Sequence, residues 1–244
     1  MLTVLWSTPR SGSNWYGHYL INQLPEKNVT YLKQYFGKYH LYSYQKHYSQ
    51  ELFYEYEKGM FYKEYYLDHF MKQIQTRIVS NKRKLNAAQE EAHRISLLDK
   101  HNLSKYPVLI SQHVKNINTD TYYYLKNKAT KNIYLYRENI VDQLASYVVA
   151  MYTNRFVSNY ESNEIITDAE IDVGSLDDLY YRILHWHMLD KKGCEIIKYE
   201  DLDFSTESKI KKRYSAKCID MVSEKMKEKI FEYAENYKAF LPKS

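Results

Sequence analysis

A run of small polar residues around one arginine follows the first apolar segment of the chain, at positions 8–14. Gly12 lets the backbone approach a ligand closely, and Arg10 adds a permanent charge on a planar fork that suits oxyanions. Between a strand and a helix, such a loop directs backbone N–H groups and the positive end of the helix dipole to one point. These residue types therefore indicate a cradle for a phosphate or sulfate group. The alternative is a polar helix cap with an incidental arginine.

A second pair of anion-binding residue types lies further along the chain. Arg137 follows the apolar run 133–136, and Ser146 falls within the next helical pattern. A phosphate monoester needs a bidentate cation and a hydroxyl donor, which an arginine at a strand end and a serine on the following helix can supply together. Taken singly, Arg137 is more typical of a surface ion pair and Ser146 of an ordinary helix interior.

The hydrophobic pattern predicts the elements that must position these residues. Short apolar runs bounded by polar residues indicate buried strands at 2–7, 107–110, 133–136 and 194–199. Apolar residues at helical spacing predict helices directly after the first loop, over 139–152 and over 175–189. Strands separated by helices imply parallel crossovers. We therefore expect an α/β fold, with a three-layer parallel sheet and flanking helices.

The 244 residues are predicted to form a single domain, 1–244, because the chain has no internal repeat and no Gly/Ser/Pro-rich linker. A long insertion, at about 25–106, is expected to be helical and rich in aromatic residues. Its tyrosine-rich part, 31–66, has a composition that could stack on bases, but packing between amphipathic helices is the favoured interpretation. Near the end of the chain, 209–229 is predicted to be a solvated, charged helix.

The composition, with 44% hydrophobic and 27% charged residues, is typical of a globular protein. A net charge of +5 is too small and too evenly spread to indicate nucleic-acid binding. No apolar run is long enough to span a membrane, and the first residues lack the basic leader of a signal peptide. We expect a soluble, cytoplasmic protein with no nucleic-acid or membrane partner. Cys194 and Cys218 match no metal or redox spacing and are interpreted as reduced packing residues. No metal is expected, because no cluster of metal-ligating residues is recognisable in the sequence.

The first loop departs from a Walker A sequence, which carries a lysine directly after its last glycine and then Ser or Thr for Mg²⁺. Here Gly12 is followed by Ser13 and Asn14, and the cation, Arg10, precedes the glycine. This argues against an ordinary nucleoside-triphosphate kinase. The segment 9–15, PRSGSNW, instead resembles the PKSGTTW or PRSGT loop by which sulfotransferases hold the 5′-phosphosulfate of 3′-phosphoadenosine 5′-phosphosulfate (PAPS).

Three later features resemble the same family. Arg137 and Ser146 are similar to its 3′-phosphate motif, and 198–202, KYEDL, resembles its YEDL segment, interpreted here as architectural. His113, at the end of the second predicted strand, stands where cytosolic sulfotransferases carry a catalytic histidine. Ser111 stands where those enzymes carry a lysine. The resemblance implies a P-loop-NTPase-like sulfotransferase fold.

The resemblance also implies an activity: transfer of a sulfuryl group from PAPS to a hydroxyl or amine of an unidentified small-molecule or glycan acceptor. Arg10 would stabilise the departing charge, His113 would act as general base, and Ser111 would donate a hydrogen bond to the sulfuryl group. Trp15 would stack on adenine. The residues implied in binding PAPS are Pro9, Arg10, Ser11, Gly12, Ser13, Asn14, Trp15, Arg137 and Ser146.

Two departures from the family pattern keep alternatives open. Golgi-type and bacterial relatives often place a glutamate base after the first helix, where this chain has Gln34, and a neutral amide is no base. The late basic segment that completes the 3′-phosphate site is not recognisable, although 211–213 carries three cations. A nucleotide kinase, or a non-catalytic nucleotide- or glycan-binding protein with the same fold, therefore remains a second interpretation.

Overall fold

The computed structural model describes residues 1–23, 30–33, 92, 95, 99, 108–114, 117–153, 166–203 and 217–240. The chain divides into two compact units. The first unit comprises residues 1–6 and 17–133, and the second comprises residues 7–16 and 134–244.

The described part of the chain contains both strands and helices. In chain order they are β1 (Leu2–Ser7), α1 (Ser13–Gln23), β2 (Thr30–Lys33), β3 (Val108–His113), α6 (Thr119–Lys128), β4 (Lys131–Tyr136), α7 (Ile140–Tyr152), α8 (Val173–Met188), β5 (Glu195–Lys198), the 3-10 helices η3 (Tyr199–Asp201) and η4 (Cys218–Met221), and α9 (Glu224–Phe240). The strands form one sheet in the order β2-β3-β1-β4-β5. The predicted α/β class is confirmed, because this is a parallel sheet with flanking helices.

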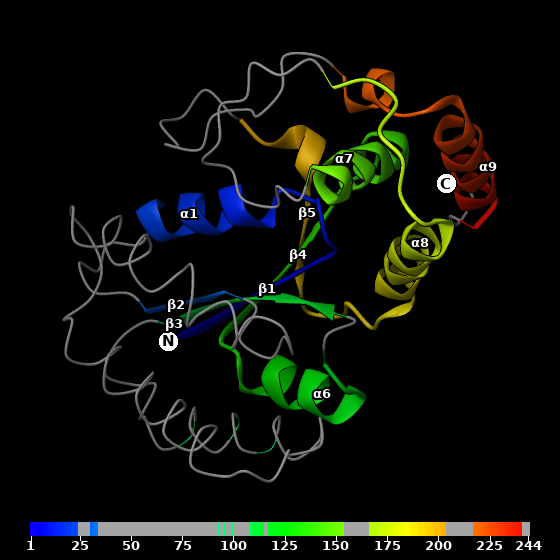
Figure 1. The fold of residues 1–244 in the computed structure, drawn as a ribbon. Coiled ribbons are helices and arrows are strands. Elements are labelled where there is room, and N and C mark those ends of the chain that lie inside the picture. The colour runs from blue at the N-terminus through cyan, green and yellow to red at the C-terminus, as the bar shows by residue number, and fades with distance from the viewer. Residues whose placement is uncertain are drawn as a thin grey trace, which may run out of the picture. The chain divides into compact units, whose positions relative to one another are not determined.

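In the first unit, β1 is buried along its whole length. Strands covered on both faces read as continuous apolar runs, which is why the sequence predicts β1, β3 and β4. β2 pairs with β3 in parallel, with Thr30 opposite Val108. Figure 1 shows α1 and α6 on opposite sides of these strands. This arrangement agrees with the layered α/β architecture expected from the alternating pattern.

Helix α6 is held to the sheet through the indole of Trp6 on β1. The Trp6 ring lies 4.9 Å from the ring of Tyr122, and its Nε1 donates to Oδ1 of Asn132 at 2.9 Å. Asn118 caps the helix, since its Oδ1 accepts from the backbone N–H of Thr121 at 2.8 Å. The pairing satisfies the indole donor of a fully buried tryptophan, as burial requires.

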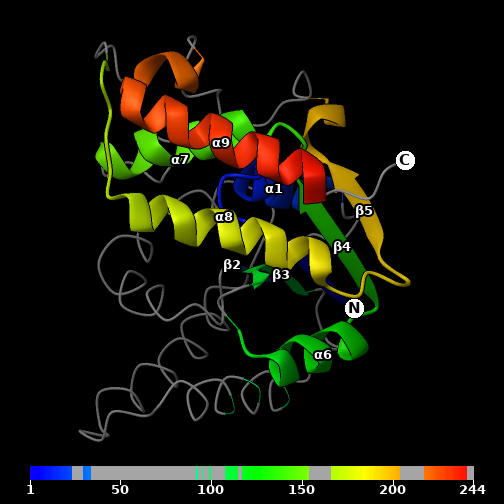
Figure 2. The same ribbon diagram turned by 90° about the vertical axis from the view of Figure 1, so that its right-hand side faces the viewer.

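The second unit has its own core between α7, α8 and α9, which lie side by side in Figures 1 and 2. Tyr180 of α8 stacks on Tyr233 of α9 with ring centroids 4.3 Å apart. The buried residues of this core are Ile140, Leu144, Ala145, Val148, Val149, Ala169, Leu176, Leu179, Tyr180, Ile183, Val222, Met226, Ile230, Tyr233, Ala234 and Tyr237. This core fixes α7, which carries Asp142, Gln143 and Ser146 of the candidate site.

Two sequence predictions need correction. The charged segment 209–229 was expected to be one solvated helix, but the helix α9 begins at Glu224 and buries Met226 and Ile230; residues 204–216 lie outside the described part. The insertion 25–106 was expected to be helical, but it contributes the strand β2. Most of it, including Gln34, lies outside the described residues. Among the described residues, no helix is both long and apolar enough to cross a bilayer.

Candidate anion-binding site

The predicted loop, residues 8–12, joins β1 to α1 in the second unit and turns tightly. The backbone N–H of Ser11 donates to Thr8 O at 3.3 Å, and the first helical bond of α1 runs from Tyr16 N to Gly12 O at 3.0 Å. Gly12 has a φ of 81° and Arg10 a φ of 63°. The first N–H groups of α1 have no partner within the helix, so the loop presents backbone donors at a helix N-terminus, as the sequence predicts.

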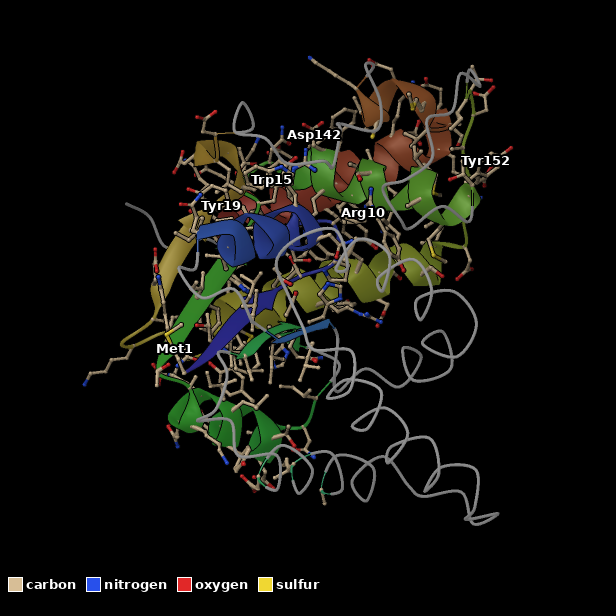
Figure 3. All side chains as sticks on the ribbon, turned by 90° about the vertical axis from the view of Figure 1, so that its left-hand side faces the viewer. Met1, Arg10, Trp15, Tyr19, Asp142 and Tyr152 are labelled. Carbon is tan, nitrogen blue, oxygen red and sulfur yellow. The ribbon has the colours of Figure 1, made fainter. Side chains whose placement is uncertain are left out.

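The structure brings Arg10 and Ser146 together. The Nε–H of Arg10 donates to the Oγ of Ser146 at 2.9 Å, although the two residues lie far apart in the sequence. Ser146 is 8% exposed and belongs to α7; the side chain of Arg10 can be followed in Figure 3. The sequence had assigned these residues to opposite ends of one ligand, and here they form a direct contact.

Gln143 is a site residue that the sequence reasoning missed. Its Nε2 donates to Thr8 Oγ1 at 2.8 Å and to Pro9 O at 2.7 Å. The signal was present in the helical pattern, because Gln143 lies three positions after Ile140, on the apolar side of α7. A polar side chain at such a position needs buried partners. The loop provides them for Nε2, whereas Oε1 is buried without a hydrogen-bond partner among the described residues.

Tyr199 contacts both the loop and the second arginine. A Cβ placed on Gly12 would lie 2.4 Å from Cδ2 and Cε2 of the Tyr199 ring, and the guanidinium carbon of Arg137 lies 4.7 Å from the ring centroid. Burial raises the pKa of the Tyr199 hydroxyl, and Arg137 opposes that rise. Position 12 thus needs glycine for two reasons, a positive φ and the close approach of a ring. Tyr199 belongs to the segment 198–202, which was interpreted as architectural from the sequence, but its contacts with the loop and with Arg137 were not foreseen.

Arg137 lies among carboxylates and is mostly buried, with 16% of its side chain exposed. Its Nη2 lies 3.3 Å from Asp142 Oδ2, and its Nε lies 3.9 Å from Glu200 Oε1, which is beyond hydrogen-bond distance. The Nε atom is buried and has no hydrogen-bond partner among the described residues. A guanidinium with one unused, buried donor fits an oxyanion. An anion arriving here would compete with Asp142.

Glu200 satisfies backbone donors at the start of α7. Its two carboxylate oxygens accept from the N–H of Glu138 at 3.1 Å and of Asn139 at 3.0 Å. Lys198 Nζ donates to Glu138 Oε2 at 3.0 Å. The segment 198–202 therefore ties the end of β5 to the end of β4, which agrees with its interpretation as architectural.

Ser11 of the loop and Trp15 of α1 are both buried. The Ser11 hydroxyl donates to Thr8 O at 2.7 Å, so its proton is used inside the loop. Trp15, which the sequence analysis expects to stack on adenine, is only 7% exposed (Figure 3). Ser13 is buried as well, whereas Pro9 and Asn14 are half-buried. In this conformation the loop offers an anion its backbone groups and Arg10 rather than the hydroxyl proton of Ser11.

The candidate base and its neighbour belong to the first unit, whereas both arginines belong to the second. His113 is half-buried at the end of β3, and its backbone carbonyl accepts from Gln112 Nε2 at 3.1 Å. Ser111 is fully buried, and its Oγ has no hydrogen-bond partner among the described residues. Buried hydroxyls without hydrogen-bond partners are uncommon in folded proteins.

Cys218 lies in the electrostatic neighbourhood of both arginines. Burial raises the pKa of its thiol, while Arg10, Arg137 and a hydrogen bond with Ser146 act in the opposite direction. The thiol is therefore neutral near pH 7 and is no strong nucleophile. The sequence analysis assigned Cys218 no role, because its spacing gives no signal.

Comparison of the sequence with models of known protein families finds no match, and no curated protein matches it.

Proposed function

We propose that this chain is a PAPS-dependent sulfotransferase with the P-loop-like fold of that family. One observation carries the proposal. The Tyr199 ring lies against both Gly12 of the loop and Arg137. The loop that carries Arg10 and the second arginine, Arg137, thus share one neighbouring side chain within one compact unit.

The loop is suited to the 5′ end of the nucleotide. The N–H groups at the start of α1 and the guanidinium of Arg10 would stabilise the negative charge that grows on the bridging oxygen as the bond from sulfur to the 5′-phosphate oxygen breaks. The acceptor oxygen or nitrogen forms the new bond to sulfur in line with that oxygen. Catalysis of this kind consists mainly of placement and charge stabilisation.

Arg137 is suited to the 3′-phosphate. Its Nε is buried and has no hydrogen-bond partner among the described residues, and a phosphate oxygen would accept from it. Asp142, at 3.3 Å from Nη2, pairs with the guanidinium in the free protein and would compete with the phosphate for it. A charge clamp at this position would favour PAPS over nucleotides without a 3′-phosphate.

His113 would take the proton of the acceptor, because a neutral imidazole near pH 7 suits a general base. Ser111, with a buried hydroxyl that lacks a hydrogen-bond partner among the described residues, would donate to the sulfuryl group. The acceptor is a hydroxyl or amine of a small molecule or glycan.

Thermal stabilisation by 3′-phosphoadenosine 5′-phosphate (PAP), compared with ATP, ADP and Mg²⁺–ATP, tests the proposal. A ligand at 100 times its Kd stabilises the native state by about 2.7 kcal/mol, so PAP should raise Tm clearly more than the other nucleotides do. Arg10→Ala should weaken PAP binding and reduce the shift. Transfer of ³⁵S from labelled PAPS to a panel of alcohols, phenols, sugars and amines then tests turnover.

The alternatives give different results in the same assays. A larger shift with Mg²⁺–ATP than with PAP would indicate a nucleotide kinase. A PAP shift without ³⁵S transfer to any acceptor of the panel would indicate a non-catalytic binding protein.

A further inference from the structure

The loop holds its arginine in a backbone conformation that is unfavourable for a residue with a Cβ. Arg10 has a φ of 63°, in the left-handed region that glycine tolerates and other residues avoid. Such conformations persist only where the surroundings over-determine them, and they are concentrated at functional sites. Some contact of the loop must therefore hold this peptide in place.

The peptide unit between Pro9 and Arg10 has few torsion angles that can change. The ring of Pro9 fixes its own φ, and the Pro9–Arg10 peptide bond is planar. The direction of the Pro9 carbonyl and the φ of Arg10 consequently change together when this peptide unit rotates. A return of Arg10 to negative φ would swing the Pro9 carbonyl away from its present direction.

Gln143 holds that carbonyl. Its Nε2 donates to Pro9 O at 2.7 Å and to Thr8 Oγ1 at 2.8 Å, so one amide group is hydrogen-bonded to two successive residues of the loop. A carbonyl oxygen only accepts, which requires the NH₂ group of Gln143 to face it. Gln143 is 1% exposed, and water has little access to compete for these bonds.

The same face of α7 also receives the Arg10 side chain. Ser146 lies one helical turn beyond Gln143, and its Oγ accepts from the Arg10 Nε–H at 2.9 Å. One helix thus fixes both the peptide before Arg10 and the first nitrogen of its guanidinium.

We infer that Gln143 is the positioning residue of this site: its amide holds the Pro9–Arg10 peptide in the orientation that sends the Arg10 guanidinium to Ser146. Gln143 acts through Arg10. The identity of the bound anion rests on the proposed function, but the positioning itself is a property of the free protein.

A ligand-free measurement tests the positioning. Gln143→Met removes both amide donors at similar volume, and Val149→Ala, in the buried core of the same helix, is the control for a general loss of stability. The Arg10 Nε–H signal is assigned in ¹⁵N spectra by its absence from the Arg10→Lys variant. Its hydrogen exchange should become about tenfold faster in Gln143→Met, the factor expected from the loss of one ordinary hydrogen bond. It should change little in Val149→Ala. Unchanged exchange in Gln143→Met, or equal acceleration in both variants, overturns the inference.

Gln143→Glu provides a second variant in case Gln143→Met fails to fold. An ionised glutamate keeps the shape but has no donor for Pro9 O, whereas the protonated acid has one. Exchange of the Arg10 Nε–H, corrected for intrinsic pH dependence, should be faster than in the wild type at pH 8 and return toward it at pH 5. A purely structural role predicts no such recovery, and its absence contradicts the inference.

The dissociation constant of PAP connects the positioning to binding. Gln143→Met should weaken PAP about tenfold in the wild-type background and have no effect in the Arg10→Ala background. An equal loss in both backgrounds shows that Gln143 does not act through Arg10 and overturns the inference. If the wild-type protein does not bind PAP, the proposed function fails, while the exchange measurement still decides the positioning.

Discussion

The substitution Gly12→Ala tests the contact between the loop and Tyr199. The new Cβ would lie 2.4 Å from two atoms of the Tyr199 ring, on a backbone with a φ of 81°. The left-handed backbone costs a residue with a Cβ about 1–2 kcal/mol, and overpacking a filled site adds typically about 1–3 kcal/mol. We expect the free energy of unfolding to fall by about 2–5 kcal/mol, the sum of these two effects.

Gly193→Ala is a matched control within the same unit. Gly193 has a φ of 76°, but a Cβ placed there would meet nothing within 4 Å. This variant should lose only the backbone contribution of about 1–2 kcal/mol. Urea denaturation of both variants gives the two free energies of unfolding, and their difference isolates the steric contribution of the Tyr199 ring.

Removal of the ring completes the test. Tyr199→Ala should cost less free energy of unfolding in the Gly12→Ala background than in the wild type, because the clashing atoms are gone; the cost of the positive φ should remain. If Gly12→Ala destabilises no more than Gly193→Ala, or if Tyr199→Ala costs the same in both backgrounds, the close contact between the loop and Tyr199 is refuted.

Three further predictions follow from the site and the core. Asp142→Asn should tighten PAP binding, because the carboxylate 3.3 Å from Nη2 of Arg137 competes with an anion; weaker binding by calorimetry would contradict this competition. Burial, with help from Lys191, lowers the pKa of His187 to about 4. As pH falls from 6.5 to 4, the unfolded state therefore binds a proton that the folded state lacks. The free energy of unfolding should decrease over this pH range, and it should show no contribution from His187 titration above it. His187→Leu should flatten this slope in urea titrations at several pH values, and an unchanged slope would argue against the assignment. His113→Ala should lower kcat while the Kd of PAP stays near the wild-type value; equal turnover would remove His113 from the mechanism.

The sequence predicted the strands β1, β3, β4 and β5 because short, bounded apolar runs mark strands in a parallel sheet. It missed β2, whose residues stand in a tyrosine-rich stretch without such a run. It also misjudged α9, where buried Met226, Ile230 and Tyr233 alternate with many lysines and glutamates. A charged majority concealed the apolar stripe of that helix.

The candidate site was predictable where residue type and local order carry the information. Gly12 and Arg10 were found from the loop sequence, but the contact between Arg10 and Ser146 depends on the distance between α7 and the loop in space, which spacing does not give. The same reason explains why Gln143, and the contacts that Tyr199 makes with the loop and Arg137, were missed. The inward direction of Ser11 was equally hidden, because a serine in a turn can face either the ligand or the loop backbone.

The central claim is that one bisphosphorylated adenosine is held by Arg10 near its 5′ group and by Arg137 at its 3′-phosphate. The Kd values of PAP and of 5′-AMP, which lacks the 3′-phosphate, should be measured by calorimetry for the wild type and for Arg137→Ala. A hydrogen bond to a charged group contributes about 1.5–3 kcal/mol, so the wild type should prefer PAP by roughly ten-fold to one-hundred-fold, and Arg137→Ala should lose that preference. A wild type that binds both equally, or an Arg137→Ala variant that keeps the full preference, would contradict the account.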